Sequence, residues 1–157
     1  MLTLTQRLPA DTNAAVPHRL ALSAEERVRS RHRFMTEQGE EVQLALPRGT
    51  ALHDGDLLAD AEGRARARVH TKPEPVLTAR ATDAFTLLRA AYHLGNRHVA
   101  LELGRDYLRI SPDTVLAEML IQLGLTIISE TVPFQPEPGA YGGHSHEFVR
   151  MPHPHHG

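Results

Sequence analysis

The sequence predicts an α+β protein with a small all-β domain, a ferredoxin-like βαββαβ domain and a disordered histidine-rich tail. Short alternating runs separated by turn residues fill the first half of the chain. Two helical patterns with start and stop signals alternate with strands in the second half. Five of the 11 histidines lie in residues 143–157, where apolar periodicity is absent. The predicted domain boundaries are 1–72, 73–136 and 137–157.

The first half is expected to form a small barrel or sandwich. Residues 2–5 alternate, and residues 27–34 place four arginines on one face of a predicted strand. A turn at residues 37–40 leads into residues 41–46, which are expected to pair with that strand in a hairpin. We interpret the arginine face as solvated; the alternative is a docking surface for a partner. Further turn signals lie at residues 47–49, 53–56 and 62–63.

A proline-rich segment at residues 72–75 is expected to link the two halves. After it, residues 76–81 are typical of a short strand. Asp83 can then cap a helix over residues 84–94, which Gly95 is expected to close.

The remainder of the second half completes the βαββαβ order. Residues 99–103 and 107–110 are expected to be strands around a turn at residues 104–106, and a last strand begins at residue 125. This topology needs only short loops and right-handed crossovers. Beyond Pro133 the chain is rich in Pro, Gly and His, which predicts a mobile tail.

Signals for a second helix lie between the third and fourth strands of this domain. Ser111 offers an N-cap, Pro112 suits the first helical position, and Asp113 faces the positive end of the helix dipole. Gly124 is expected to end the helix. Its apolar face is formed by Leu116, Met119, Leu120 and Leu123.

Composition excludes several classes of function. The chain has no cysteine, which rules out disulfides, thiolate zinc sites and iron–sulfur clusters. Its net charge of −2 favours neither nucleic acid nor an anionic membrane. The N-terminus does not resemble a signal peptide, and no segment approaches the roughly 20 apolar residues of a membrane span. A cytoplasmic protein is therefore expected.

The histidines near the C-terminus carry the strongest chemical signal. Imidazole suits Ni²⁺, Zn²⁺ and Cu²⁺, and a His-x-His spacing lets two rings reach one ion from an extended backbone. Capture and release fit a mobile segment better than catalysis, which needs rigidly held groups. The alternatives are a solvated low-complexity tail and a purification tag, although the interleaved residues argue against a tag. The candidate ligands are His144, His146, His153, His155 and His156.

A fixed histidine elsewhere would strengthen metal binding through effective concentration. His98, just beyond the predicted end of the first helix, is the best candidate. The alternative is that it only complements the helix dipole. His93, inside that helix, is expected to pack or to support the ligands. The four histidines of the β half are interpreted as surface residues: His18, His32, His53 and His70.

Several segments resemble one protein family. Residues 91–99, which read AYHLGNRHV, resemble the signature of the UreE urease accessory proteins. Residues 46–50 (LPRGT), 73–77 (PEPVL), 133–137 (PFQPE) and 139–141 (GAY) resemble segments of the same family. The GNRH portion is fairly specific, and the set of segments in the family's order is strongly so.

The resemblance implies a β domain of the peptide-binding kind and a ferredoxin-like domain that forms a homodimer. It implies that His98 of each subunit meets its equivalent at the dimer face to hold one Ni²⁺, for which Zn²⁺ or Cu²⁺ can substitute. Tail histidines would complete the coordination, His144 and His146 before the others. The partner-binding residues that it implies are Gly95, Asn96 and Arg97. The implied partners are the urease accessory GTPase and the urease apoprotein complex.

One departure from the family concerns the start of the second helix. Some relatives carry a His-x-His pair there, whereas residues 111–114 of this chain read SPDT. Only Asp113 could bind a metal, and capping is its expected role. Accessory metal sites on that surface are therefore not expected.

The predicted function is that of a nickel metallochaperone for urease maturation, and not that of an enzyme. A nickel or zinc buffer without a dedicated recipient is the main alternative. A metalloenzyme is disfavoured because no HExxH or comparable ligand set occurs, and no phosphate-binding loop is present for nucleotide chemistry. A third alternative is a peptide-binding chaperone that acts through the β half, with the tail regulatory.

Overall fold

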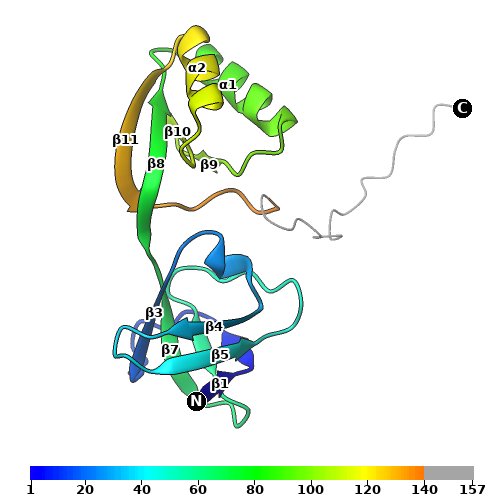
Figure 1. Cartoon of the computed structure of the whole chain (residues 1–157), viewed down its shortest axis with the longest axis vertical. Coiled ribbons are helices and arrows are strands. Elements are labelled where there is room, and N and C mark those ends of the chain that lie inside the picture. The colour runs from blue at the N-terminus through cyan, green and yellow to red at the C-terminus, as the bar shows by residue number, and fades with distance from the viewer. Residues whose placement is uncertain (140–157) are drawn as a thin grey trace, which may run out of the picture.

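The structure, a computed structural model, describes residues 1–139. It has two lobes, an N-terminal β domain and a C-terminal α/β domain, which confirms the predicted α+β class (Figure 1). The tail histidines, from His144 to His156, lie outside the described residues. No helix within residues 1–139 is long and apolar enough to cross a membrane.

Two small sheets make up the N-terminal domain. The first has the order β1-β5-β4, with β1 parallel and β4 antiparallel to β5, and the second has the order β2-β6-β7-β3. The strands of the first sheet are β1 (Leu2–Leu4), β4 (Arg31–Met35) and β5 (Glu41–Ala45). Those of the second are β2 (Gln6–Leu8), β3 (His18–Leu22), β6 (Leu57–Ala59) and β7 (Ala65–Thr71).

The two sheets share one core, because alternate side chains of their strands point inward. Val42 and Leu44 of β5 and Leu20 and Val69 of the second sheet are fully buried in the same cluster. The predicted hairpin is confirmed, since β4 and β5 pair in antiparallel register around a turn that contains Gly39 at φ 85°.

The arginine-rich segment is not one continuous strand, so the prediction of four arginines on one strand face is wrong. Glu26–Val28 forms a short 3-10 helix, η1, and β4 begins only at Arg31. Arg27 is buried, and its guanidinium donates to the carbonyl oxygens of Leu22 and Phe134. The helical turn breaks the two-residue alternation, and it directs this side chain inward.

The C-terminal domain has the predicted βαββαβ order, and its sheet, β11-β8-β10-β9, is antiparallel throughout. This is the ferredoxin-like arrangement. Both helices pack on one sheet face through a core that includes Leu77 and Leu108 of the sheet and Leu94 and Leu120 of the helices (Figure 1). The elements are β8 (Pro73–Arg80), α1 (Ala84–Asn96), β9 (Glu102–Leu103), β10 (Tyr107–Ile110), α2 (Thr114–Gln122) and β11 (Thr126–Pro133).

The segment predicted to be a linker is part of a strand. Only Lys72 separates β7 from β8, which begins at Pro73. Pro73 and Pro75 are tolerated because this end of β8 pairs with β11 alone, while β10 pairs only from Leu77 onward. Nearly continuous extended chain therefore connects the two lobes (Figure 1).

The chain directly beyond β11 is packed against the fold. Phe134 is fully buried beside Ala24 and Val76, in a small cluster that joins the two lobes. The Gln135 and Glu137 N–H groups are also hydrogen-bonded to the fold, so the prediction of a mobile tail from residue 134 onward is wrong for residues 134–137. A single aromatic residue among prolines carries no periodicity, so sequence reasoning missed this contact.

Each helix begins at an aspartate. Asp83 accepts a hydrogen bond from the Thr86 N–H at 2.8 Å, which confirms the predicted cap. Asp113 accepts from the Leu116 N–H at 2.9 Å and is itself the N-cap of α2. The prediction of Ser111 as that cap is wrong, because α2 begins two residues later than the proline signal indicates, whereas the expected capping role of Asp113 is confirmed.

Candidate metal centre at the end of α1

His98 follows directly on the C-terminus of α1. The helix continues through Gly95 to Asn96, so the prediction that Gly95 closes it is wrong. The Val99 N–H donates to the Leu94 carbonyl at 3.4 Å, and the His98 N–H donates to the Gly95 carbonyl at 3.1 Å. This pair of bonds forms a Schellman motif, which places His98 at the position that is usually left-handed and usually glycine.

The backbone of His98 is left-handed. Its φ is 54°, and it is the one non-glycine residue with positive φ within residues 1–139. The left-handed conformation costs an L-residue roughly 1–2 kcal/mol, although His adopts it more readily than most side chains. Strain of this kind concentrates at functional sites. The backbone conformation therefore marks His98 as a candidate functional residue.

His98 is exposed to solvent. Within residues 1–139, no group of three or more His, Cys, Asp or Glu side chains is arranged to hold a metal ion. The described part of one chain thus brings no complete set of metal ligands together around His98. An ion bound here would need further ligands from residues 140–157, from a second copy or from water.

The other predicted residues of this segment surround the helix end. Gly95 and Asn96 are exposed in the last turn of α1. Arg97 is also exposed, and its guanidinium donates to the His93 carbonyl at 3.0 Å, which satisfies one terminal carbonyl of the helix. The half-buried His93 ring lies edge-on to Tyr92, with a centroid distance of 5.3 Å.

Three large apolar side chains of α1 face solvent. Phe85, Leu88 and Tyr92 have exposed fractions of 69%, 67% and 66%. They are spaced three and four residues apart, so they lie along one side of the helix. We name them the α1 stripe. A row of exposed apolar side chains of this kind is typical of protein–protein contact, and it runs toward the helix end that precedes His98.

The histidines of the β domain are less accessible than predicted. His53 is exposed, whereas His18, His32 and His70 are half-buried. His18 Nε2 lies 3.1 Å from a Glu40 carboxylate oxygen. Burial, and then the charge of Arg19, lowers the pKa of His70, which favours its neutral ring. These contacts are local to the domain.

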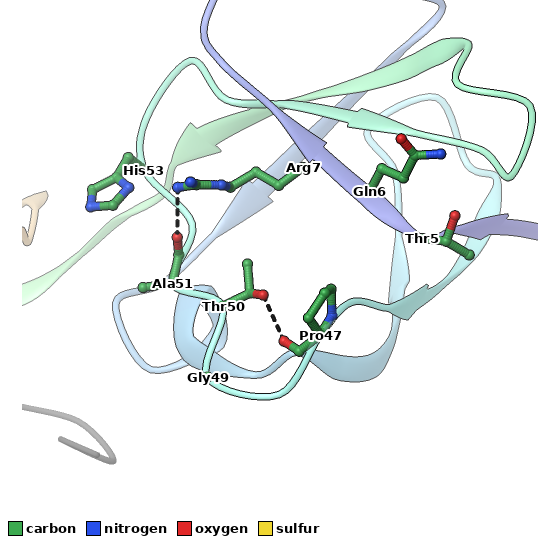
Figure 2. A pocket seen from close by; sticks show the side chains of 8 residues that line it. All are labelled: Thr5, Gln6, Arg7, Pro47, Gly49, Thr50, Ala51 and His53. Atoms are coloured by element: carbon green, nitrogen blue, oxygen red, sulfur yellow. Dashed lines mark hydrogen bonds between the residues drawn. The ribbon is translucent and has the colours of Figure 1, made fainter. Parts of the chain in front are cut away.

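A separate cavity of about 540 Å³ lies in the β domain (Figure 2). The Arg7 guanidinium points toward the Ala51 carbonyl, to which it donates at 3.4 Å, and the Thr50 hydroxyl donates to the Pro47 carbonyl at 2.6 Å (Figure 2). The cavity is lined by Thr5, Gln6, Arg7, Pro47, Gly49, Thr50, Ala51 and His53. The cavity belongs to the β domain, so it is distinct from the end of α1.

The fold and the site together define a class: a β domain joined to a ferredoxin-like domain that presents an exposed, backbone-strained histidine beside an apolar helix face. Two family models, described as the N-terminal and C-terminal domains of the UreE urease accessory protein, match residues 4–70 and 74–157. The chain therefore belongs to the UreE family of urease accessory proteins, which confirms the resemblance seen in the sequence.

Individual relatives agree with this assignment. The chain is 58% identical to the urease accessory protein UreE of a Nostoc species over 144 residues, which cover 92% of this chain and 98% of the relative. It is 46% identical to that of Nitrosococcus oceani in an alignment 165 positions long, which covers 99% of this chain and 97% of the relative. Membership of this family implies a role in urease maturation.

Proposed function

We propose that this protein is a nickel metallochaperone that carries Ni²⁺ to the urease maturation complex for assembly of the urease active site. The observation that carries the proposal is the exposed His98, held with a left-handed backbone at the end of α1. Family membership supports the recipient, because the relatives are named urease accessory proteins. An accessory role in the cytoplasm, rather than catalysis, is part of the same proposal.

Ligand chemistry supports a divalent ion of borderline softness. Neutral imidazole suits Ni²⁺, Zn²⁺ and Cu²⁺, so zinc or copper can substitute in solution. Nitrogen sites generally bind Cu²⁺ more tightly than Ni²⁺. Selectivity for nickel therefore depends on site geometry and on metal supply rather than on the ligand type alone.

A single imidazole holds an ion weakly, so we propose that a second copy of the chain supplies another. In an isologous dimer, residue 98 of both subunits can lie close to the two-fold axis. The α1 stripe supports this arrangement, because burying one such side chain contributes roughly 1.5–3 kcal/mol. The homodimer would thus cover the apolar side of α1 and bring two imidazoles together.

Exchangeable ligands would allow capture and then release of the ion. The proposed tail ligands are His144 and His146, with His153, His155 and His156 as weaker ligands. The exposed residues next to His98 are proposed to contact the urease accessory GTPase and the apoprotein complex during transfer: Gly95, Asn96 and Arg97.

Nickel titration of the full chain, by calorimetry and equilibrium dialysis, tests the anchor. His98→Ala is expected to abolish the tight site of the dimer, while sedimentation velocity shows an unchanged dimer. His53→Ala is the matched control, because His53 is an exposed histidine of the other domain. It should bind nickel as the parent does. Retention of the tight site by His98→Ala would refute the proposed anchor.

Metal binding alone does not separate delivery from buffering. We expect the nickel-loaded protein to co-elute with the purified urease accessory GTPase and to transfer its ion to that partner. Co-elution without transfer, or no association at all, would favour the buffering function. Both assays use the same loaded protein, so a failure of loading cannot be mistaken for a failure of delivery.

A further inference from the structure

Glu102, on the short strand β9, carries a buried carboxylate with an exposed fraction of 8%. Its Oε2 accepts hydrogen bonds from the Tyr107 hydroxyl at 2.9 Å and from the Arg109 guanidinium at 2.8 Å. Its Oε1 accepts from the backbone N–H of Gln135 at 2.7 Å. A carboxylate is stable in such a place only when it is bonded this fully. Oε2 thus binds two side chains of the neighbouring strand β10, and Oε1 binds the backbone of the chain beyond β11.

Neighbouring residues keep this carboxylate in position. The Arg109 guanidinium also donates to the Thr78 hydroxyl at 3.0 Å and lies 4.4 Å from the centroid of the Tyr107 ring. Gly104 leaves room for that ring, because a Cβ at this residue would lie 2.1 Å from it. The hydrogen bond to Glu102 raises the pKa of Tyr107, which keeps its hydroxyl protonated as a donor. Side chains of the neighbouring strands therefore hold the Glu102 carboxylate in one position.

Two further contacts fix the same stretch of chain, residues 134–137, which we name the tail root. Phe134 is fully buried, and its carbonyl accepts a hydrogen bond from Arg27. The Glu137 N–H donates to the Leu101 carbonyl at 2.8 Å. Figure 1 shows the tail root crossing beneath β9. The start of the histidine-bearing segment is thus tied to the strand that follows His98.

The lengths of two chain segments, 98–101 and 137–144, limit how far the tail histidines start from His98. Leu101 follows His98 by three residues, so their Cα atoms are at most about 11 Å apart. His144 follows Glu137 by seven residues, which span at most about 25 Å. Because Glu137 is hydrogen-bonded to Leu101, seven residues of chain from Glu137 are long enough to extend to His98. A fixed origin raises the effective concentration of the tail imidazoles at that place.

We propose that Glu102 is a positioning residue for nickel binding, because its bond to the Gln135 N–H fixes where the histidine-bearing segment leaves the fold. The inference rests on the proposed function, since it applies only if His98 and the tail histidines share an ion. When the bond is lost, the tail root gains freedom, and more conformational entropy is lost when the tail binds the ion. Glu102 then acts on nickel affinity without touching nickel.

A double-mutant cycle in the full-length chain tests this role. Glu102→Gln is placed in the native chain and in a chain whose five tail histidines are replaced by asparagine. Calorimetry is expected to show a loss of about tenfold in nickel affinity with the native tail, a size typical of groups that support ligands. It should show no loss with the asparagine tail. Equal losses in both chains, or no loss with the native tail, would overturn the proposal.

Two further variants distinguish a loss of positioning from a general loss of stability. Gln135→Pro removes the donor on the tail side and leaves Glu102 bonded to Tyr107 and Arg109, so it should reproduce the loss. Glu130→Gln is the matched control, because the carboxylate of Glu130, on β11, also lies near the Arg109 guanidinium, at 3.9 Å, whereas the Gln135 N–H donates to Glu102. Its nickel affinity should equal that of the parent. A loss in Glu130→Gln as large as in Glu102→Gln would count against a specific role.

Amide hydrogen exchange reports on the tail root without nickel. The Glu137 N–H is expected to exchange faster in Glu102→Gln than in the parent, and unchanged exchange would overturn the positioning role by itself. The proposed function fails separately, if the native and asparagine tails bind nickel equally or if His98→Ala keeps the tight site. The two failures are therefore distinguishable.

Discussion

The two helices of the ferredoxin-like domain end in the same way but on different residues. At the end of α2, the Leu125 N–H donates to the Leu120 carbonyl and the Gly124 N–H to the Ile121 carbonyl, each at 3.0 Å. This repeats the pattern at the end of α1, with Gly124 in the place that His98 takes there. The backbone φ is 104° at Gly124 and 54° at His98.

Both helix ends require a residue with a left-handed backbone, but only the end of α1 presents a side chain at that residue. A left-handed residue is all that the hydrogen bonds require, and glycine supplies it without a steric penalty. At α2 the chain uses glycine. At α1 it uses a histidine whose side chain is exposed, so packing does not account for the choice. The proposed role of the imidazole in nickel binding accounts for it.

The largest expected effect comes from making the two helix ends alike. His98→Gly should lower nickel affinity by at least about 100-fold, the upper range seen when mere support of a metal ligand is lost. The free energy of unfolding should stay the same or rise by up to about 1 kcal/mol, because glycine relieves the left-handed strain. Calorimetry and urea unfolding measure the two quantities.

His98→Ala provides the control for that substitution. It should lose the same affinity, but it should be about 1 kcal/mol less stable than His98→Gly because alanine keeps a Cβ in a left-handed backbone. Equal stability of the alanine and glycine variants would show that this backbone stores no strain.

Acidification should act on metal binding at the α1 end. Imidazole binds metal only when it is neutral, and its ordinary pKa is about 6.5. Lowering the pH from about 7.5 to 5.5 should therefore reduce nickel affinity, because protons compete with the metal for the imidazole nitrogens. Calorimetry across this range checks the slope. A flat profile would contradict histidine ligation.

The reciprocal change, Gly124→His, should affect stability alone. A Cβ at Gly124 would meet only Thr86 Cγ2 at 3.8 Å, an ordinary contact, so the cost arises in the backbone. We expect a loss of about 1–2 kcal/mol in the free energy of unfolding. Nickel affinity should equal that of the parent. Weaker nickel binding in this variant would show that the two helix ends are coupled.

The smallest effects are expected at the other ends of the same helices. Asp83→Ala and Asp113→Ala each remove an N-cap and should lower Tm by about 2–4 °C. Hydrogen bonds from Thr86 hold the pKa of the Asp83 carboxyl below its usual range. Its contribution is therefore present above the unfolded pKa, near 4, and is lost as the pH falls through the lower folded value. Thermal unfolding at pH 7 and pH 3 should show the difference between parent and Asp83→Ala shrinking in acid.

Local signals predicted much of the fold correctly. The β4–β5 hairpin, the Asp83 cap and the βαββαβ order all depend on residues that are near one another in the sequence. Contacts over long sequence separations were missed. Arg27 is buried because the distant Phe134, together with the nearby Leu22, supplies an acceptor, and no pattern within residues 27–34 reveals either partner.

The candidate site was also predicted only in part. His98 could be named from the sequence, but its backbone conformation could not, because Gly95 offered a more obvious helix end three residues earlier. The attachment of the tail root to Glu102 was also invisible, since the Gln135 donor is a backbone group that every residue but proline carries.

By itself, the sequence determined the fold class, the family and the identity of the exposed histidine, because periodicity, caps and local motifs are properties of neighbouring residues. Only the tertiary structure decided that residue 98 would be left-handed and that the chain after β11 would be anchored beside it. Both outcomes depend on hydrogen bonds whose partners are selected by packing. Each of these bonds has a backbone group as its donor, its acceptor or both, and backbone groups leave no mark in the order of side chains.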